Sequence, residues 1–554
     1  MVTLTKDLSR KTTPAPQVHV NERCVGCQEC IIRCPTKALS LDSVRWVAAA
    51  DNSLCVGCRQ CERVCPVSAV TVEGSVLVGE RMKLATHAGP IRKGDISEVR
   101  PGLATLNEAV REAERCLNCP DPTCVRGCPA HNDIPAFIEA IRNRDLPRAQ
   151  KVLAATTFLP DVCSRVCDWA NQCEGACSWA LAGAEPVAIG KLERFMTDNS
   201  PFEPTRRSMR SGKRLSVGII GAGPAGIAAA LELASAGSSV TLYDRERALG
   251  GVMHWGIPSY VLPDAASQRP VEALVDAGVD VKPSSEITPG SIDELLKKHD
   301  VVVAALGAPV PERPRFPGVE LKGMVDATTF LKKAKSALAH SVPMPELDGA
   351  VVAVLGGSNT ALDVARSVIR LGGRPVVIHR REERFSRARP DEIAEAKAEG
   401  VEFRFATNIS RLEGEDGSVK QAVLVRTRQK AASAPSDPMK GTESRLKVDT
   451  VVLATGYGLD QSFTPVLGNL PLRPPSTDRV LPDRRWLASG ILAGHTKAGN
   501  LAWEREYALQ SSAVPRHERV WLIGDALTGP SSVVASMAQG KMAARAILER
   551  FSDR

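Results

Sequence analysis

From residue 215 onward, short apolar runs followed by glycine-rich turns recur along the chain. Residues 217–220 predict a buried parallel strand, followed by a helix over 227–236 and a second strand over 239–243. The same strand–turn–helix pattern begins again at Val351. Further buried strands are expected at 300–307, 375–378, 451–456 and 520–525. Alternating strands and helices of this kind predict parallel sheets with Rossmann-like topology.

The first 200 residues follow a different pattern. Residues 106–115 and 134–152 have the apolar spacing of helices, the second with Asn132 or Asp133 near its cap and Pro135 in its first turn. Residues 201–214 predict a linker, and 431–445 a surface loop. A chain of 554 residues is too long to fold around one hydrophobic core, so we expect an α/β and α+β multidomain protein.

Composition excludes several classes of protein. With 43% hydrophobic and 24% charged residues, the chain is ordinary for a globular protein. It has no run of about 18 apolar residues, which predicts no membrane span, and its N-terminus lacks the apolar core of a signal peptide. We therefore expect a cytoplasmic protein. The formal net charge of +8 is not gathered into one basic run, so nucleic-acid binding is not expected.

The first glycine-rich turn has the spacing of a dinucleotide site. Gly221 permits the tight turn, Gly223 lets the backbone approach a pyrophosphate, and Gly226 lets helix and strand pack closely. Asp244, at the end of the next strand, can accept a hydrogen bond from a ribose hydroxyl. Glycine turns of this spacing also occur by chance, but the ordered strand, turn, helix, strand and acid favour a bound FAD.

The second turn predicts a nicotinamide nucleotide site. Its candidate residues are Gly356, Ser358, Asn359 and Thr360, and the following strand leads to Arg380 and Arg381. Arginine at this strand end can pair with the 2′-phosphate of NADP(H), whereas an acid would favour NAD. Ser358 occupies the place of the second motif glycine and would crowd the pyrophosphate. The alternative interpretation is a pair of solvated arginines.

All 16 cysteines lie between Cys24 and Cys177. In a long chain without secretion signals, this indicates metal ligands rather than disulfides. The motif CxxCxxCxxxCP occurs twice, as in bacterial two-cluster ferredoxins, in which the fourth cysteine of each motif reaches the other cluster. By that rule, one 4Fe–4S cluster binds Cys24, Cys27, Cys30 and Cys65, and the other binds Cys55, Cys58, Cys61 and Cys34. Eight thiolates in this duplicated spacing argue against structural zinc, which needs four.

A further eight cysteines follow in two groups on a largely helical frame. They are Cys116, Cys119, Cys124 and Cys128, and then Cys163, Cys167, Cys173 and Cys177. This number again predicts two 4Fe–4S clusters, about four in all, although the spacing does not fix the pairing. Zinc is the alternative for this region.

From Cys116 to the C-terminus, the chain resembles the glutamate synthase small subunit and the N-terminal half of dihydropyrimidine dehydrogenase. The resemblance rests on CLNC, CPAHNDIP, IGKLERF and the two nucleotide motifs. It implies one cluster on Cys116, Cys119, Cys124 and Cys177. It implies another on Cys128, Cys167 and Cys173 with Glu193 as fourth ligand, whereas simple counting would use Cys163. It also implies a flavin contact at Asp525 of the GD motif. Gly251, a glycine after the second strand, would allow close approach to the flavin.

These features together predict an order of domains. They are a 2×4Fe–4S ferredoxin-like domain at 1–78, a helical Fe–S domain at 79–200, a linker at 201–214, an FAD domain at 215–345 and 451–554, and an inserted NAD(P)H domain at 346–450.

The cofactors predict an electron-transfer enzyme without an acid–base catalytic residue, because they supply the chemistry. We expect a hetero-oligomer that moves electrons between NADPH and ferredoxin, or a partner such as a 2-oxoacid:acceptor oxidoreductase. The first alternative is a glutamate synthase (NADPH) small subunit. The added ferredoxin module argues against it, because the usual small subunit lacks such a module. The second is a non-catalytic scaffold, which would bind no flavin.

Overall fold

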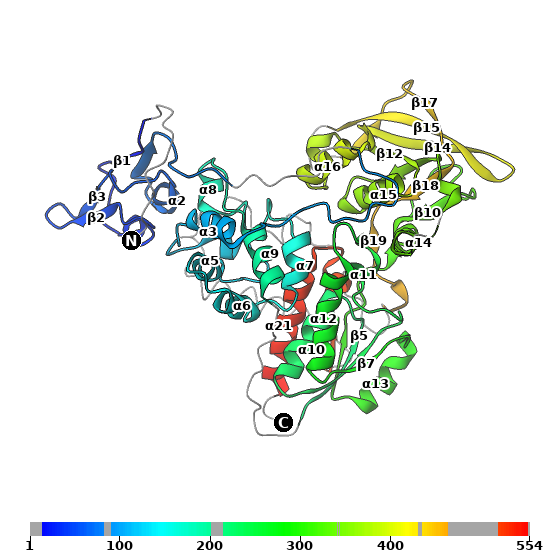
Figure 1. Cartoon of the computed structure of the whole chain (residues 1–554), viewed down its shortest axis with the longest axis horizontal. Helices are drawn as coiled ribbons and strands as arrows, with labels where there is room; N and C mark the ends of the chain where they lie inside the picture. Colours follow the sequence, from blue (N-terminus) through cyan, green and yellow to red (C-terminus); the bar gives the residue numbers. More distant parts are fainter. Residues whose placement is uncertain are drawn as a thin grey trace.

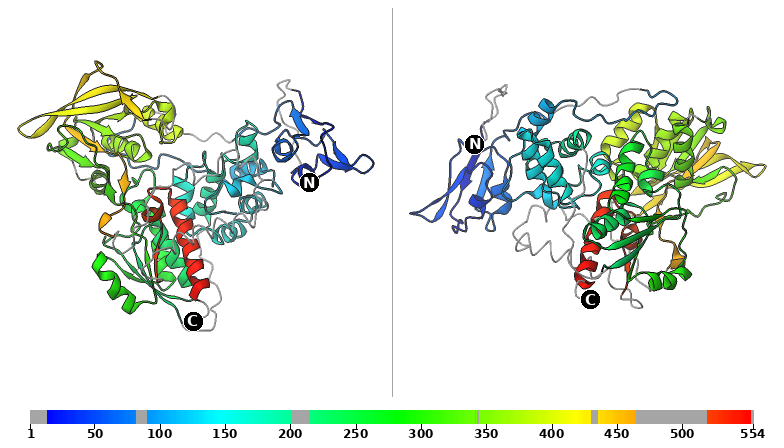
Figure 2. Two further views of the ribbon diagram at one scale, coloured as in Figure 1. Left: turned by 180° about the vertical axis from the view of Figure 1, so that it is seen from behind. Right: turned by 60° about the horizontal axis from the view of Figure 1, so that its bottom comes forward.

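The computed structural model describes residues 14–81, 90–200, 214–340, 342, 344–429, 435–463 and 519–551. Except for Arg214, the expected linker at 201–214 lies outside these ranges. Figure 1 shows a ferredoxin-like module, a helical domain and two nucleotide domains. Both views in Figure 2 place the ferredoxin-like module on the far side of the helical domain from the nucleotide domains.

The ferredoxin-like module, residues 14–81, consists of two antiparallel strand pairs, β1–β4 and β2–β3, and two short helices. Each helix follows a cysteine loop in which a glycine, Gly26 or Gly57, has a positive φ (+68° and +72°). A Cβ on Gly26 would lie 2.3 Å from the Trp46 carbonyl oxygen, so the loop requires glycine there. The elements are β1 (Gln17–Val20), α1 (Glu29–Ile32), β2 (Leu39–Asp42), β3 (Val47–Ala50), α2 (Gln60–Val64) and β4 (Val70–Glu73).

The helical domain contains two helices where one was expected over 134–152. Asp133 caps the first by accepting a hydrogen bond from the Ala136 N–H, as the sequence indicated. The chain then turns at Arg144 (φ +62°). Asp145 caps the second helix, and Pro147 in its first turn has no N–H with which to continue the first. The helices are α3 (Leu106–Glu114), α4 (Thr123–Arg126), α5 (Ile134–Arg142), α6 (Leu146–Ala154), α7 (Pro160–Val166), α8 (Ser178–Leu181) and α9 (Ile189–Asn199).

The first nucleotide domain has a five-stranded parallel sheet in the order β20-β8-β5-β6-β7. Its strands are β5 (Ser216–Ile220), β6 (Ser239–Tyr243), β7 (Asp280–Lys282), β8 (Val301–Ala304) and β20 (Val520–Leu522). Its helices are α10 (Pro224–Ser235), α11 (Val252–Trp255), α12 (Asp264–Asp276), α13 (Ile292–Lys298), α20 (Asp525–Thr528) and α21 (Val533–Phe551). Among the described helices, none is both long and apolar enough to cross a membrane.

The second nucleotide domain has a parallel sheet in the order β10-β18-β11-β12-β13 and an antiparallel sheet beside it. The parallel strands are β10 (Met324–Asp326), β11 (Val351–Leu355), β12 (Arg374–His379), β13 (Glu402–Phe405) and β18 (Thr450–Leu453). The helices are α14 (Ala327–Ala339), α15 (Asn359–Arg370) and α16 (Pro390–Glu399). The antiparallel strands are β14 (Thr407–Glu415), β15 (Ser418–Gln429), β16 (Ser436–Pro438) and β17 (Ser444–Lys447). The prediction of a surface loop over 431–445 was therefore wrong at β16 and at the start of β17, where the chain forms strands.

Strand pairing corrects the expected domain boundaries at 345/346 and 450/451. β10 and β18 pair in parallel, and β18 also pairs with β11, so both belong to the second domain. The chain instead crosses between domains at β9 (Val310–Pro311) and β19 (Tyr457–Gly458), which pair with each other. Hydrophobic pattern alone cannot assign β10 or β18 to one of two parallel sheets, because both sheets bury similar strands.

A connecting segment, residues 90–104, ties the second nucleotide domain to the helical domain (Figure 1). The Gly94 N–H donates to the Arg370 carbonyl, and the Val99 N–H to the Tyr260 carbonyl, both at 2.8–2.9 Å. Arg100 forms a bidentate pair with Glu395 of α16 at 2.9 and 3.1 Å. The segment therefore contacts both nucleotide domains before it enters α3.

A buried charge cluster holds α15 against α16. Arg366 and Arg370 both donate to the Glu399 carboxylate, at 2.6–3.2 Å. The Arg370 guanidinium also stacks 3.8 Å from the centre of the buried Tyr260 ring of the first nucleotide domain. Burial opposes ionisation of Glu399, but hydrogen bonds from the two arginines lower its pKa overall.

We predict that Glu399→Ala destabilises the second nucleotide domain by about 3–5 kcal/mol, because it leaves the buried Arg370 guanidinium without a carboxylate partner and leaves Arg366 with Glu395 alone. Chemical denaturation of the variant measures the change. Glu383→Ala, which removes an exposed pair with Lys397, is the control and should cost about 0–1 kcal/mol. The pKa of Glu399 is lower in the folded state than in the unfolded state. Its contribution to the free energy of unfolding is therefore complete above the ordinary glutamate pKa of about 4.3 and is lost at lower pH. Equal losses in both variants would contradict this account.

Candidate cofactor and iron–sulfur sites

The glycine turn after β5 leaves an open space at the N-terminus of α10. Gly221 has φ +101°, and a Cβ there would lie 2.3 Å from the Ala305 carbonyl oxygen. A Cβ on Gly226 would lie 1.9 Å from the Gly221 carbonyl oxygen, so the strand and helix require both glycines. A Cβ on Gly223, by contrast, would meet no protein atom within 4 Å. The turn thus fits a pyrophosphate in front of the helix N–H groups.

Two further segments meet this turn. Asp244, at the end of β6, accepts hydrogen bonds from the Ala222 N–H (2.6 Å) and the Glu246 N–H (2.8 Å). Gly251 has φ +55°, and its Cβ would lie 2.9 Å from the Gly223 Cα. The structure therefore brings Gly251 to the turn and fixes Asp244 beside it. Their contacts with ribose and flavin stay predictions.

Asp525 begins α20 on the same side of the sheet. One of its oxygens accepts hydrogen bonds from the Ser531 N–H and from the hydroxyls of Ser531 and Ser536, at 2.7–3.1 Å. Burial raises the pKa of Asp525, and these donors counteract that rise. The long helix α21 crosses α10 so closely that a Cβ on Gly540 would lie 2.1 Å from the Ala225 carbonyl oxygen. Gly540 is a residue that sequence reasoning missed, since no motif marks it.

The second glycine turn lies between β11 and α15. A Cβ on Gly356 would lie 2.3 Å from the Ala454 carbonyl oxygen, and one on Gly357 would lie 2.2 Å from the His379 ring. Ser358 is the N-cap of α15 but makes no side-chain cap bond, which leaves its hydroxyl available. The Asn359 side chain accepts from the Arg389 N–H at 3.0 Å. Thr360 lies in the first turn of α15, partly exposed.

Positive charge gathers at the carboxyl end of β12. Burial, and then Arg381, Arg380 and Arg387, lower the pKa of His379 to about 4. Burial and the other two arginines also lower the pKa of Arg381. Among the described residues, none of the three guanidinium groups has an acidic partner in an ion pair. Mutual repulsion without a carboxylate fits the binding of a phosphate anion. Arg387 lacked a sequence signal, because it reaches the site from the loop after β12.

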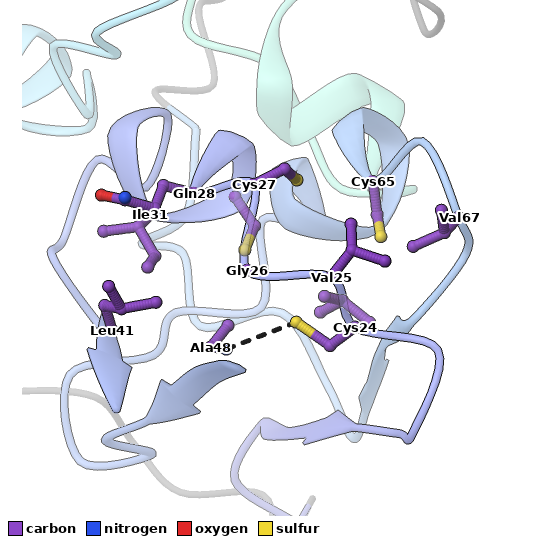
Figure 3. Close-up of a pocket in the computed structure, with 12 residues that line it drawn as sticks. Cys24, Val25, Gly26, Cys27, Gln28, Ile31, Leu41, Ala48, Cys65 and Val67 are labelled. Atoms are coloured by element: carbon purple, nitrogen blue, oxygen red, sulfur yellow. Dashed lines mark hydrogen bonds between the residues drawn. The ribbon is translucent and has the colours of Figure 1, made fainter. Parts of the chain in front are cut away.

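The ferredoxin-like module brings its eight thiols together in two sets. Cys24, Cys27, Cys30 and Cys65 line one cavity, shown in Figure 3 with Val25 beside it. Burial, and then the neighbouring thiols, raise the pKa of Cys30 to about 11. The second set is Cys34, Cys55, Cys58 and Cys61. Burial, and then the neighbouring thiols of the set, raise the pKa values of Cys58 and Cys61. Closely grouped thiolates need a cationic centre among them, so both sets fit an iron–sulfur cluster.

The helical domain has two more cavities of this kind. Cys116, Cys119, Cys124 and Cys177 line one of them. The other is lined by Cys128, Cys167 and Cys173, and by both proposed fourth ligands, Cys163 and Glu193. Glu193 is buried, which raises its pKa to about 8, and its Oε1 has no hydrogen-bond partner. The structure thus brings together both sets expected from the resemblance, and the choice of fourth ligand stays a prediction.

Comparison with known proteins agrees with these sites. Residues 23–69 match the 4Fe-4S dicluster domain family, 92–203 match dihydropyrimidine dehydrogenase domain II, 4Fe-4S cluster, and 215–473 match pyridine nucleotide-disulphide oxidoreductase. The Azospirillum brasilense glutamate synthase [NADPH] small chain is 33% identical over 382 residues, covering 66% of this chain and 78% of that protein. This chain belongs to the glutamate synthase small-chain family.

Two other relatives match different shares of the chain. The Escherichia coli protein UacF is 29% identical over 560 residues, covering 96% of this family member and 82% of UacF. The beta subunit of the Moorella thermoacetica NADP(+)-dependent formate dehydrogenase is 34% identical over 376 residues, covering 61% of this chain and 51% of that subunit. The expected multidomain fold and its FAD, NADP(H) and 4Fe–4S cofactors are confirmed for this small-chain family member.

We predict that Gly223→Ala binds FAD about tenfold to hundredfold more weakly while the fold is unchanged. The added methyl group meets no protein atom but would crowd the pyrophosphate, at a cost of about 1–3 kcal/mol. FAD content and thermal stability of the apoprotein are the measurements. Gly290→Ala, in the same domain, is the control, because its Cβ would meet only the Thr288 hydroxyl at 4.0 Å. Normal FAD content in Gly223→Ala would contradict the assignment.

We also predict that Arg380→Ala or Arg381→Ala raises the KM for NADPH about tenfold to hundredfold and leaves the KM for NADH nearly unchanged. A hydrogen bond to a charged group contributes about 1.5–3 kcal/mol, and only NADPH carries the 2′-phosphate. Steady-state kinetics with both nucleotides measure the effect. Arg374→Ala, at the exposed start of the same strand, is the matched control. A parallel loss for both nucleotides would refute phosphate recognition.

Proposed function

We propose that this chain is an electron-transfer subunit that moves electrons between NADPH and a partner iron–sulfur oxidoreductase, through FAD and four 4Fe–4S clusters. The observation that carries the proposal is the order in which the cysteine cavities follow one another from the flavin site. A bound flavin exchanges hydride with a nicotinamide and single electrons with clusters. The chain's task is to hold these groups in sequence.

The cavity of Cys128, Cys167 and Cys173, called the inner cavity below, lies next to the flavin site. Val534, in the first turn of α21, lines it. Gln172, another lining residue, donates to the Ser532 hydroxyl at 3.5 Å, and the adjacent Ser531 binds Asp525. The start of α21 therefore contacts both the inner cavity and the aspartate that we assign to FAD.

The remaining cavities follow in a row. Cys173 of the inner cavity interacts electrostatically with Cys124 of the next. Cys119 in that cavity interacts with Cys58 of the ferredoxin-like module. Contacts across this last junction are also direct, since Gln60 donates to the Asp121 carbonyl at 3.1 Å and Arg33 to the Asp121 carboxylate at 3.0 Å. The fourth cysteine set, called the outer cavity below, consists of Cys24, Cys30, Cys65 and the exposed Cys27.

The outer cavity is the end that we assign to the partner. Relatives named as a glutamate synthase small chain and a formate dehydrogenase beta subunit are subunits of larger enzymes. By analogy, we assign this chain to a hetero-oligomer in the cytoplasm, where thiols stay reduced. We propose ferredoxin or a 2-oxoacid:acceptor oxidoreductase as its redox partner.

Glutamate synthase is the second candidate, favoured by the small-chain relatives. Anaerobic purification from the native cell, followed by identification of the bound subunit, distinguishes the two. Glutamine-dependent NADPH oxidation by the purified complex would establish the second candidate, and its absence with an active ferredoxin or 2-oxoacid partner would establish the first.

We predict that anaerobic protein contains about sixteen irons and one FAD and is bleached by NADPH. Cys58→Ala should lose about four irons and slow the reduction of added ferredoxin at least about tenfold, while NADPH still bleaches the flavin. Stopped-flow absorbance separates these two steps. Ser43→Ala, at an exposed site in the same module, should behave as the unaltered protein. Failure of NADPH to bleach the unaltered protein would refute the proposed function.

A further inference from the structure

Exposed apolar side chains are concentrated in the ferredoxin-like module. The described residues include eleven large apolar side chains that are exposed, and five of them belong to this small module. Three of the five lie in two loops beside the outer cavity: Val25 is 67% exposed, Val44 87% and Trp46 64%. Apolar side chains grouped on a surface in this way indicate an interaction site.

The two loops contact each other beside the outer cavity. A Cβ on Gly26 would lie 3.9 Å from the Trp46 Cβ, so the Trp46 side chain begins next to the cysteine loop that contains Val25. Two residues after Trp46, the Ala48 N–H donates to Cys24 Sγ at 3.4 Å (Figure 3). Val25 and Trp46 therefore lie on one surface, close to a ligand sulfur of the outer cavity.

The backbone conformation at Trp46 is one that a tryptophan rarely adopts. Its φ is +54°, in the left-handed region that favours glycine and asparagine. The ring gains little from packing in return, because most of it is exposed. Strained residues of this kind gather at functional sites. Since asparagine would suit this turn better, the tryptophan ring indicates a task at the surface.

The charges of the two loops cancel. Arg45 in the turn pairs with Asp42 at 2.7 Å, and in the cysteine loop Arg23 directly follows Glu22. Such a surface fits a partner that is held by apolar contact rather than attracted by net charge. Electron-transfer contacts are small, often below about 1,200 Å² in total. Tryptophan is enriched among the residues that dominate binding.

We infer that Val25, Val44 and Trp46, called the apolar rim below, are the surface on which a small ferredoxin-type iron–sulfur protein docks. The inference rests on the proposed function, which makes the outer cavity the place where electrons enter or leave the chain. Single electrons pass efficiently only over short distances, so the acceptor has to cover the surface beside the exposed Cys27. One electron passes from the reduced outer cluster to the oxidised ferredoxin, and no bond forms or breaks.

Trp46→Asn tests the inference, because asparagine suits the backbone conformation but removes the ring. We expect the Kd for a two-cluster bacterial ferredoxin, measured with both proteins oxidised, to rise at least about tenfold. Iron content and the bleaching of the flavin by NADPH should stay unchanged, and thermal stability should not fall. Ser43→Ala, in the same turn, is the control and should leave the Kd unchanged.

A matched pair of valine variants separates position from residue type. Val44→Ala should raise the Kd for ferredoxin about twofold to fivefold. Val275→Ala, at a similarly exposed valine of α12 in the first nucleotide domain, should not change it. In stopped-flow experiments, the second-order rate constant for ferredoxin reduction should fall only in the two rim variants, Trp46→Asn and Val44→Ala.

Several results would overturn the inference. They are absence of ferredoxin binding by the unaltered protein, an unaltered Kd in Trp46→Asn, and loss of iron from that variant, which would show that the ring protects the cluster. A Kd that rises steeply with salt would make the contact electrostatic. Self-association that Trp46→Asn abolishes, without ferredoxin binding, would make the rim an interface between copies of the chain.

Two further outcomes keep the test decisive. If Trp46→Asn does not fold, equal Kd values for Val44→Ala and Val275→Ala would overturn the inference. Unaltered protein that binds ferredoxin but is not bleached by NADPH would refute the proposed function alone.

Discussion

The packing of α7 against the first nucleotide domain is the contact on which the rest of the structure depends. Leu159, Val162 and Cys163 share one hydrophobic core with α10 and α21. At the same junction, the Lys541 ammonium group donates to the Ala155 carbonyl at 2.7 Å. Single electrons pass efficiently only between neighbouring cofactors, so this shared core fixes the step from flavin to cluster. A looser interface would leave two intact domains without a route between them.

A second constraint comes from buried charge between domains. Arg389 is the N-cap residue of α16 in the second nucleotide domain, and its side chain donates to the Cys167 carbonyl at 2.5 Å and to Glu392 at 2.5 Å. It also stacks 5.3 Å from the centre of the Trp169 ring. The cysteine that we assign to the inner cluster is therefore held on one side by the nucleotide domain. Arg389 thus links Asn359 of the second glycine turn to the inner cavity.

Local patterns in the sequence predicted much of this arrangement. The glycine turns at Gly221 and Gly356, the paired ferredoxin motifs and the cap at Asp133 each depend on residues close together in sequence, and the structure shows those elements. The assignment of β10 and β18 was wrong because parallel pairing joins strands more than a hundred residues apart. The single helix expected over 134–152 is two helices, because Asp145 and Pro147 favour the start of a second helix over continuation of the first.

The site shows the same division. Nearly every assigned residue lies at a turn or strand end that its motif marks. Gly540, Arg387 and Arg389 were missed, since each reaches its site from a distant element without a local signature. The sequence also left two candidates for the fourth ligand of the inner cluster. Only the spatial arrangement shows that both Cys163 and Glu193 line the inner cavity, and that the buried Glu193 Oε1 has no hydrogen-bond partner there.

The connecting segment has a consequence for how the enzyme turns over. Together with β9–β19, it holds the second nucleotide domain at three separate points of the chain. A hinge-like rotation of that domain would have to break the Arg100–Glu395 pair and strip Arg389 of its buried acceptors, and breaking a buried charge pair costs about 3–5 kcal/mol. These contacts disfavour such a rotation, and they favour exchange by entry and exit of the dinucleotide while the second nucleotide domain stays docked.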